Sequence, residues 1–441
     1  MDNAQHTERS IGLWGAVMTL VGLVIGASIF ILPGQLAGIA GPSVIVAYLV
    51  GGLMAFFTCL IAAQIGCIIS RSGGSFHAIT DIISPTVGFL VMWATILAVV
   101  LACALVSLGF ADYLQVYFPG VAKLPAALGL VVIFCVINIA GARASVFSQT
   151  AMTAIFLVVT AVFIVAGLHS MNTDNLVPLL PLGLPGLTAI IVPAYFSWTG
   201  VTMLMEIGGE IKNPTKNIPL SVFIAFAIIL VFYIGVCVAL VGTIPWEDLG
   251  QHSAPVAAAA ELLLPGWMVS AITLSAVLAA ATSLISLLLA DPRDLYAMSK
   301  QGLLPAFLGQ LRGPHAVPAN AVLVMALITV AALFTGGKII DFASIAVIAF
   351  MLLQIILAVA LVRLPMKMPE EYQNASFRLP IPLIWFCAAF VALSSLAFLI
   401  KSVMDDPGKS LFFVVFMLVG WIYYLLRLRY LNNTATAEEA S

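Results

Sequence analysis

The stretch Gly22-Leu-Val-Ile-Gly26-Ala-Ser-Ile-Phe30 interrupts the first long apolar run of this chain, which extends from about residue 11 to residue 40. Two glycines four residues apart, followed by a second small pair, lower helix propensity and leave backbone groups uncovered. Such a break is tolerated in a membrane only where protein or a water-filled cavity supplies hydrogen-bond partners. The alternative is a packing face, in which Gly22 and Gly26 let two spans approach closely.

A second interruption, Ser197-Trp198-Thr199-Gly200, lies inside the sixth apolar run. Two interrupted helices at corresponding places in the two halves of a chain are the best sequence indicator of a transporter binding site. The second break therefore favours a binding site over simple packing. Because the two runs are five spans apart, the two halves are predicted to be inverted repeats.

The composition places the chain in a lipid bilayer. Of the 441 residues, 63% are hydrophobic and 8% are charged, whereas soluble domains have roughly 45–50% apolar and about 25% charged residues. The six cysteines lie in apolar runs without metal-ligand spacing, so neither disulfides nor a metal site is expected from them. No cofactor and no nucleic-acid partner is predicted, and the oligomeric state is left open.

An all-α membrane protein with one transmembrane domain of twelve spans is predicted, since each span needs about 20 apolar residues. The first repeat covers 11–168 and the second 187–363, and two extra helices follow in 381–430. A short outer helix is expected at 254–264, and the polar tail 432–441 is expected to be disordered. The spans are 11–40, 43–70, 85–117, 124–141, 146–168, 187–210, 219–243, 257–290, 319–336, 339–363, 381–402 and 409–430.

The basic residues predict the orientation. Of the 17 lysines and arginines, thirteen fall in loops on the side of the N-terminus, and only Lys123, Lys338, Lys401 and Lys409 lie on the other side. Lysine and arginine accumulate in cytoplasmic loops. Both ends of the chain, 1–10 and 431–441, are therefore predicted to be cytoplasmic, with the protein in the plasma membrane.

Four segments, in this order, resemble the amino acid–polyamine–organocation (APC) transporters. The stretch 22–30 resembles their first-helix signature, and Arg71-Ser-Gly-Gly-Ser-Phe76 is similar to their first cytoplasmic loop. The run 196–219 resembles their sixth helix and its exit, and 293–305 is similar to the loop after their eighth helix. The resemblance implies a five-plus-five inverted repeat of the LeuT type, with two additional C-terminal helices.

The two breaks offer complementary helix ends. The helix that restarts after the first break is expected to have free amides at Gly26, Ala27 and Ser28, which suit a carboxylate. The first half of span six ends near 196–198, and its carbonyls, with those near residue 25, suit an ammonium. Together these ends fit the two charges of an α-amino acid. The expected contacts are Val24, Ile25, Gly26, Ala27, Ser28, Phe196, Ser197, Trp198, Thr199 and Gly200, with Ala104 and Ser107 of span three.

The surroundings of the breaks predict the class of substrate. No carboxylate lies at this depth, so the second ammonium of a polyamine would be unpaired in a medium of low dielectric constant. A small neutral or apolar amino acid is favoured, with a polyamine or organic cation as the alternative. The resemblance implies an aromatic gate at Phe196, and packing between helices is the other interpretation. A channel or a membrane enzyme is disfavoured, because neither pore-lining rings nor a nucleophile with a nearby base is evident.

Three modes of coupling stay open: a proton, sodium, or exchange without an ion. Some members of the family carry a lysine in the fifth helix, and the corresponding position here is Phe156. Glu206, about 9 Å along the span from Gly200, is the candidate proton carrier, because a lone carboxylate inside a membrane is a functional candidate. Its alternative role is a structural acceptor for backbone amides or a serine. Asp291, at the end of span eight, is interpreted as a helix stop whose further role is open.

Other polar groups could complete the coupling machinery. Thr282 and Ser283, in the middle of span eight, supply hydroxyls that can complete a sodium site against carbonyls of the broken helices. The alternative is that they bond to their own helix. Glu210 is expected to hold the cytoplasmic loop near Lys212 or Arg293. Because a buried carboxylate can take up a proton near neutral pH, the proton is slightly favoured over sodium.

Overall fold

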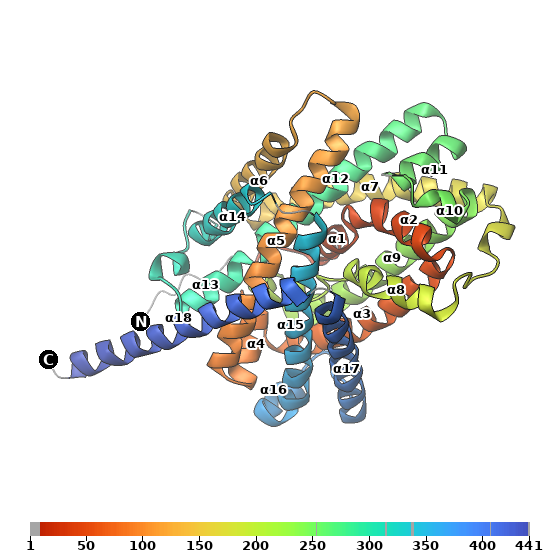
Figure 1. The fold of residues 1–441 in the computed structure, drawn as a ribbon. Helices are drawn as coiled ribbons and strands as arrows, with labels where there is room; N and C mark the ends of the chain where they lie inside the picture. Colours follow the sequence, from red (N-terminus) through yellow and green to blue (C-terminus); the bar gives the residue numbers. More distant parts are fainter. Residues whose placement is uncertain (1–8, 253, 314, 337–338, 406, 440–441) are drawn as a thin grey trace.

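The computed structural model describes residues 9–252, 254–313, 315–336, 339–405 and 407–439, and every regular element in them is a helix (Figure 1). The first half of the chain forms α1 (Leu13–Ile25), α2 (Ser28–Ala40), α3 (Ser43–Ile68), α4 (Gly74–Ile82), α5 (Pro85–Tyr117), α6 (Lys123–Ile139) and α7 (Ala142–Ser170).

The second half begins with the short 3-10 helix η1 (Thr173–Leu176). It continues with α8 (Gly183–Phe196), η2 (Met203–Met205), η3 (Gly208–Glu210), α9 (Pro214–Thr243), α10 (Trp246–Leu249), α11 (Pro255–Leu263) and α12 (Gly266–Ala290). The last elements are α13 (Pro292–Lys300), η4 (Ala306–Gly309), α14 (Ala319–Phe334), α15 (Ile339–Lys367), α16 (Pro369–Gln373), α17 (Ile381–Asp405) and α18 (Pro407–Glu439).

Nine helical segments of the described chain are long and apolar enough to cross a membrane. Three shorter apolar helices lie in the three remaining predicted spans: α6 and α14 match 124–141 and 319–336, whereas α8 covers only the first part of 187–210. Each predicted span therefore corresponds to an apolar helix, and the chain is a multi-pass helical membrane protein. The grouping of these helices into two inverted repeats stays a prediction.

Two further predictions are wrong. The span predicted at 257–290 is divided, because Leu264 is extended and α12 begins only at Gly266 after Pro265; the preceding α11 is the short helix expected at 254–264. The tail expected to be disordered continues α18 as far as Glu439. Extending an existing helix adds one hydrogen bond per residue and needs no new nucleation step. α18 therefore includes residues that the sequence places in the tail.

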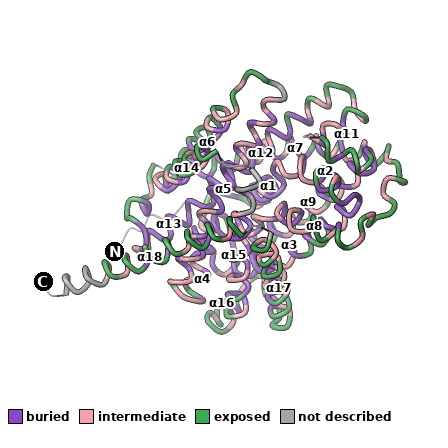
Figure 2. Tube along the Cα trace, viewed as in Figure 1, coloured by how far each residue is buried: buried purple, intermediate pink, exposed green. Residues whose placement is uncertain are grey.

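The burial pattern separates inner helices from outer ones. In the segment Gly266–Lys300, 89% of the most apolar 18-residue stretch is buried. The corresponding share in Pro407–Leu431 of α18 is 17%. α1 is an inner helix that packs against α7, α9 and α12. Figure 2 shows the contrast between the buried interior and the exposed α18.

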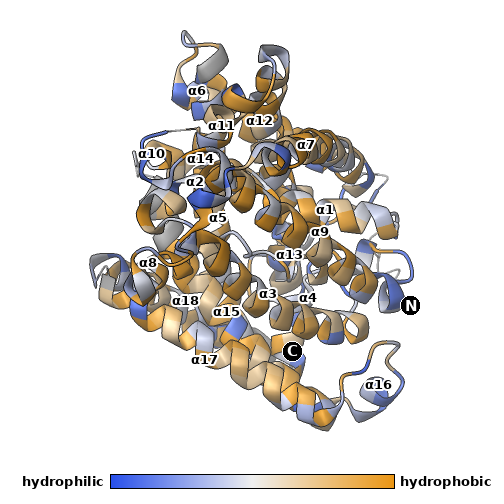
Figure 3. Ribbon diagram, turned by 90° about the vertical axis from the view of Figure 1, so that its right-hand side faces the viewer, coloured by the Kyte–Doolittle hydropathy of each residue, from blue (hydrophilic) through white to orange (hydrophobic). Residues whose placement is uncertain are grey.

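The outer surface of the helices is apolar. Large apolar side chains such as Val136 in α6, Val158 in α7 and Leu425 in α18 are exposed. Figure 3 shows hydrophobic residues along the outer helices, including α17, and hydrophilic residues near α16. This distribution is the one expected when lipid tails surround the bundle, because apolar side chains are stable in hydrocarbon and helices bond most of their own backbone groups.

Candidate substrate site at two helix breaks

The two breaks lie against each other. A Cβ atom on Gly200 would be 3.0 Å from Leu23 Cδ2 and 3.8 Å from Val24 Cγ2. Trp198, in the second break, is fully buried and lies against Gly51 of α3, where an added Cβ would meet its ring at 3.2 Å. Segments about 170 residues apart in the chain therefore form one buried site.

The first break is formed by Gly26. This residue has φ 42° and ψ −153°, and its N–H donates to the Gly22 carbonyl at 3.1 Å. The Gly26 amide, expected to be free for a carboxylate, is therefore already bonded within α1, because the chain is still helical up to this residue. α2 begins at Ser28, and its Phe30 N–H donates to the Ala27 carbonyl at 3.1 Å, so the amides left without an acceptor in α2 are those of Ser28 and Ile29. A Cβ on Gly26 would lie 2.0 Å from Ser283 Oγ. Both the positive φ and the close approach of α12 therefore require glycine here.

Gly22 lies inside α1 and has a packing role. A Cβ at this position would lie 2.0 Å from Gln149 Nε2 and 2.4 Å from Thr153 Oγ1 of α7. The packing interpretation of the two glycines and the break interpretation are therefore compatible: Gly22 brings α7 close, and Gly26 interrupts the helix.

The second break is longer than the sequence predicts. After Phe196 the chain does not resume an α-helix over 197–210 but forms turns and the 3-10 helices η2 and η3, with Gly200 at φ 97°. The Phe196 carbonyl, expected to be free, accepts from the Thr199 N–H at 3.0 Å and the Thr199 hydroxyl at 2.8 Å. Local i to i+3 bonds thus satisfy part of the carbonyl end expected for the substrate.

Tyr233 of α9 joins the two breaks. Its hydroxyl lies 2.9 Å from the Val24 carbonyl, 3.4 Å from the Ile25 carbonyl and 2.9 Å from the Ser197 carbonyl. Its fourth neighbour is Ser28 Oγ at 2.7 Å. The carbonyl groups expected to receive the substrate ammonium therefore meet the hydroxyl of this tyrosine.

Acceptors outnumber donors around the Tyr233 hydroxyl. The phenol has one proton and can satisfy one of the three carbonyls, and the Ser28 hydroxyl donates to the Ile25 carbonyl at 2.8 Å. The carbonyls also lie at the C-terminal end of α1 and just after α8, where the helix dipole is negative. A group with three N–H donors and a positive charge matches this set of oxygen atoms.

Aromatic side chains close one side of the site. The Tyr48 hydroxyl bonds to Ser197 Oγ at 2.9 Å, and the Tyr48 ring lies 5.0 Å from the ring of Tyr233. The ring of Trp198 lies 5.2 Å from that of Tyr233. Phe196, the predicted gate, is half-buried and packs against the core around α1.

The hydroxyls of Thr282 and Ser283 reach the first break. Thr282 Oγ1 donates to the Gly22 carbonyl at 2.9 Å or to the Ala279 carbonyl of its own helix at 2.6 Å. Ser283 Oγ donates to the Leu23 carbonyl at 3.0 Å. These oxygen atoms are ligands of the type that binds sodium. The hydroxyls, however, already donate hydrogen bonds to the carbonyls and contribute no charge.

Three other positions lie in α5 and α7. Ala104 and Ser107 are buried in α5, and the Ser107 hydroxyl donates to the Cys103 carbonyl at 2.7 Å. Among the described residues, no side-chain hydrogen bond joins either of them to α1, α2 or α8. Phe156 is fully buried in α7 and supplies no charge.

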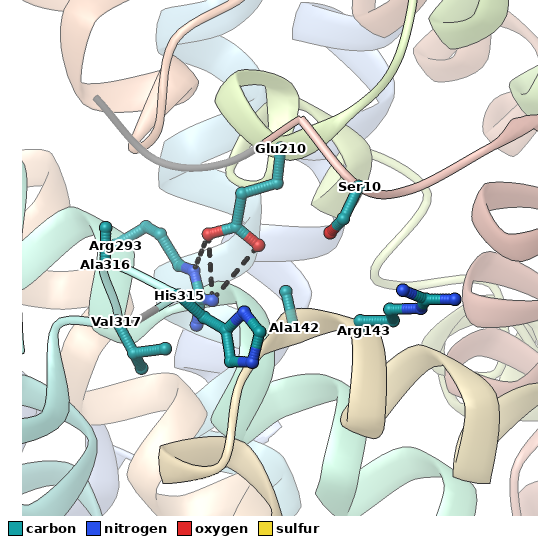
Figure 4. A pocket seen from close by; sticks show the side chains of 8 residues that line it. All are labelled: Ser10, Ala142, Arg143, Glu210, Arg293, His315, Ala316 and Val317. Atoms are coloured by element: carbon teal, nitrogen blue, oxygen red, sulfur yellow. Dashed lines mark hydrogen bonds and ion pairs between the residues drawn. The ribbon is translucent and has the colours of Figure 1, made fainter. Parts of the chain in front are cut away.

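At one end of the bundle, the N-terminal residues of the first span are tied to the end of the sixth. The Ile11 N–H donates to the Glu210 carbonyl at 2.9 Å, and the Lys212 N–H donates to the Ile11 carbonyl at 2.8 Å. Arg293 and Glu210 form a buried ion pair with Nε–Oε1 and Nη2–Oε2 distances of 2.9 and 3.2 Å (Figure 4). Of the two partners predicted for Glu210, the structure selects Arg293.

Glu206 lies near this end and takes the structural contacts considered for it. The Ser75 N–H donates to Glu206 Oε2 at 3.2 Å, and the Ser75 hydroxyl donates to Oε1. Asp291 is the single residue between α12 and α13; it is buried, and its side chain makes no capping hydrogen bond to α13. Within the described chain, no group of three or more histidine, cysteine, aspartate or glutamate side chains has metal-binding geometry.

Sequence reasoning did not identify Tyr233, Ser75 or Asp294 as parts of these sites. A tyrosine in the middle of an apolar span is a usable signal, because its hydroxyl needs a partner when buried. Ser75 lies in α4 and Asp294 in α13, two short helices between the predicted spans whose packing the sequence alone does not specify. Their contacts with Glu206 depend on how α4 and α13 pack.

These features define a multi-pass helical membrane protein with a buried site between two interrupted helices. The model of the amino acid permease family matches residues 11–423, and the chain belongs to this family. The resemblance to the APC superfamily is thereby confirmed.

Three relatives show the range of the similarity. The chain is 25% identical to the methylthioribose transporter of Bacillus subtilis (strain 168), over 96% of this chain and 94% of that protein. It is 23% identical to the branched-chain amino acid permease BcaP of the same organism, over 95% and 93%. It is 25% identical to the vacuolar cationic amino acid transporter 4 of Arabidopsis thaliana, over 76% and 59%. The family and these relatives support an amino acid transporter.

Proposed function

We propose that this chain is a secondary active transporter that moves a small neutral or apolar amino acid across the plasma membrane by alternating access. The observation that supports it most is the meeting of the two breaks at Tyr233. There, three carbonyl oxygens compete for one phenol proton, next to the free amides of α2. The ammonium and carboxylate of one amino acid would satisfy both ends.

The proposed topology places both termini in the cytoplasm, with 11–168 and 187–363 as inverted repeats and 381–430 as additional helices. The Glu210–Arg293 end of the bundle then faces the cytoplasm. The contacts of Ile11, Glu210 and Arg293 join the first span, the end of the sixth and α13 there, which supports a state closed toward the cytoplasm.

The substrate class follows from the charges near the breaks. Leu23, Val24, Phe196 and Trp198 are apolar, and the next acid along the sixth span is Glu206, which is bonded to Ser75. A second ammonium group would thus be buried without a partner, at a cost of several kcal/mol. A polyamine or organic cation is the less favoured alternative.

We expect amino acids from the size of alanine to that of leucine to compete for binding to the purified protein, and arginine and putrescine to fail. Displacement of a labelled neutral amino acid by a panel of the twenty amino acids, putrescine and methylthioribose measures this. Binding of arginine or putrescine without displacement by any neutral amino acid would contradict the substrate class. Binding of methylthioribose alone would contradict amino acid transport.

We propose a proton as the coupling ion, with Glu206 in its binding site; sodium at Thr282 and Ser283, or exchange without an ion, are the alternatives. In proteoliposomes, a pH gradient that is acidic outside should drive accumulation, and a sodium gradient should not. Glu206→Gln should lose accumulation but keep counterflow, because exchange needs the substrate site and no proton cycle. Asp81→Asn, which alters a partly exposed acid, is the matched control. Proton-driven accumulation unchanged in Glu206→Gln would rule out Glu206.

A further inference from the structure

Three buried carboxyl groups gather at the Arg293 end of the bundle. Glu206 lies between η2 and η3, Asp291 lies between α12 and α13, and Asp294 lies in the first turn of α13, with exposed fractions of 5%, 8% and 2%. Arg293 is committed to Glu210. No lysine or arginine of the described chain forms an ion pair with the three acids. Because an unpaired buried charge is costly, they cannot all be ionised.

The carboxyl groups of Glu206 and Asp294 lie side by side, within reach of a shared hydrogen bond. Two ionised carboxylates have only acceptors, so this bond requires a proton on one of them. Glu206 also accepts both bonds from Ser75, in the first turn of α4, whereas Asp294 Oδ1 is buried without a partner. Glu206 is thus the better-stabilised anion, and Asp294 is the group that donates the shared proton.

The pair lies where three segments meet. The Gly73 N–H donates to the Glu206 carbonyl at 2.8 Å, and Ser72 forms an isolated bridge with Ile207. On the other side of the loop, a Cβ on Gly73 would lie 2.6 Å from the Cβ of Ala297 in α13. The loop before α4 is therefore held between the end of the sixth span and α13, and the Glu206–Asp294 bond connects these two sides.

The other ionisable groups near the pair provide no compensating charge. On the α4 side, Asp81 pairs with the exposed Arg71 at 3.7 Å. Burial lowers the pKa of His77 from its usual range, which favours the neutral imidazole. η4 and α14, which pack against α13, contain no ionisable side chains. On the α12, α13 and α5 side lie Asp291, the Glu210–Arg293 pair and the thiol of Cys103. α13 also carries Tyr296 and, in its last turn, the exposed Lys300, whose ammonium lies over the Tyr296 ring at 5.8 Å.

We propose that Asp294 and Glu206 bind one proton between them and that this proton holds the cytoplasmic side of the transporter closed. When the proton passes to water, two carboxylates remain in contact, and their repulsion separates α13 from the end of the sixth span. The loop before α4 is then released. The assignment to the cytoplasmic side rests on the proposed function, whereas the proton site rests on the contacts of the pair.

Infrared spectroscopy of the purified protein tests the proton directly. At neutral pH we expect a carbonyl stretch band of a buried protonated carboxyl group that is lost in Asp294→Asn. Asp291→Asn and Asp81→Asn should retain this band. If Asp294→Asn kept every protonated-carboxyl band of the unaltered protein, the assignment would be overturned; a separate band that only Asp291→Asn removes would belong to Asp291. No substrate is needed, so a failure of the proposed transport function would leave this result interpretable.

Thiol labelling tests the closing function. Ser72 is buried in the loop before α4, so a cysteine introduced by Ser72→Cys reports on the opening of that loop. The six native cysteines are buried and form no disulfides. The protein without Ser72→Cys measures their background labelling. After normalisation to the unfolded reporter at the same pH, the labelling rate should rise with pH, by at most about tenfold per unit for one proton. In Asp294→Asn it should be low and independent of pH, because the amide donates permanently to Glu206.

A second variant keeps the test decisive if Asp294→Asn does not fold. Glu206→Gln should also remove the pH dependence of labelling, since Asp294 can then bond to a neutral amide. Asp81→Asn should show the pH dependence of the unaltered protein. If Glu206→Gln and the unaltered protein gave the same pH profile, the pair would not control the opening.

Discussion

Replacing Gly26 by valine is expected to abolish substrate binding while the bundle still folds. The residue has φ 42°, where a β-branched side chain is strained by roughly 1–3 kcal/mol or more. Its Cβ would also lie 2.0 Å from Ser283 Oγ and 3.3 Å from the Leu23 carbonyl. Relief of this contact would displace the start of α2, whose free amides are the proposed carboxylate site. Equilibrium binding of a labelled amino acid to the purified variant measures the effect.

Gly129→Val is the matched control for this substitution. Gly129 is exposed in α6, and a Cβ there would meet nothing within 4 Å. This variant adds the same side chain to an apolar helix and should bind substrate as the unaltered protein does. Normal binding in Gly26→Val would place the substrate site elsewhere, and equal loss in Gly129→Val would indicate a general effect of the added side chain.

Replacing Glu210 by glutamine is expected to destabilise the protein by about 3–5 kcal/mol, the usual cost of leaving one member of a buried ion pair without its partner. Arg293 is fully buried, and Glu210 is its paired carboxylate, with a closest N–O distance of 2.9 Å. The glutamine keeps the shape and one acceptor but removes the charge. Thermal unfolding in detergent should show a clearly lower midpoint temperature.

The exposed pair Lys123–Asp112 provides the control for Glu210→Gln. Its N–O distance is 2.6 Å, but its side chains are 40% and 44% exposed, and such pairs contribute about 0–1 kcal/mol. Asp112→Asn should therefore unfold close to the temperature of the unaltered protein. Equal shifts in the two variants would show that burial of the Arg293–Glu210 pair adds no stability.

The sequence predicts most of the architecture because membrane helices have a strong local signal. A span needs a long apolar run, and the glycines at 22, 26 and 200 interrupt helices wherever the rest of the chain lies. This is why the helix boundaries near Ile25 and Phe196 could be predicted, whereas the pairing of Glu210 with a basic residue was implied by the resemblance to the family. The errors occurred where local rules compete, as at Pro265 between α11 and α12 and in the continuation of α18.

The sequence by itself therefore determined the class of protein, the approximate spans and the positions of both breaks, since these depend on hydropathy and on backbone propensities of neighbouring residues. Only the tertiary structure decided which groups meet there. Tyr233 reaches the carbonyls of Val24 and Ser197, and Ser75 and Asp294 reach Glu206, because α9, α4 and α13 pack against segments far away in the chain. Contacts of this kind depend on the three-dimensional packing of side chains and leave no periodic pattern in the sequence.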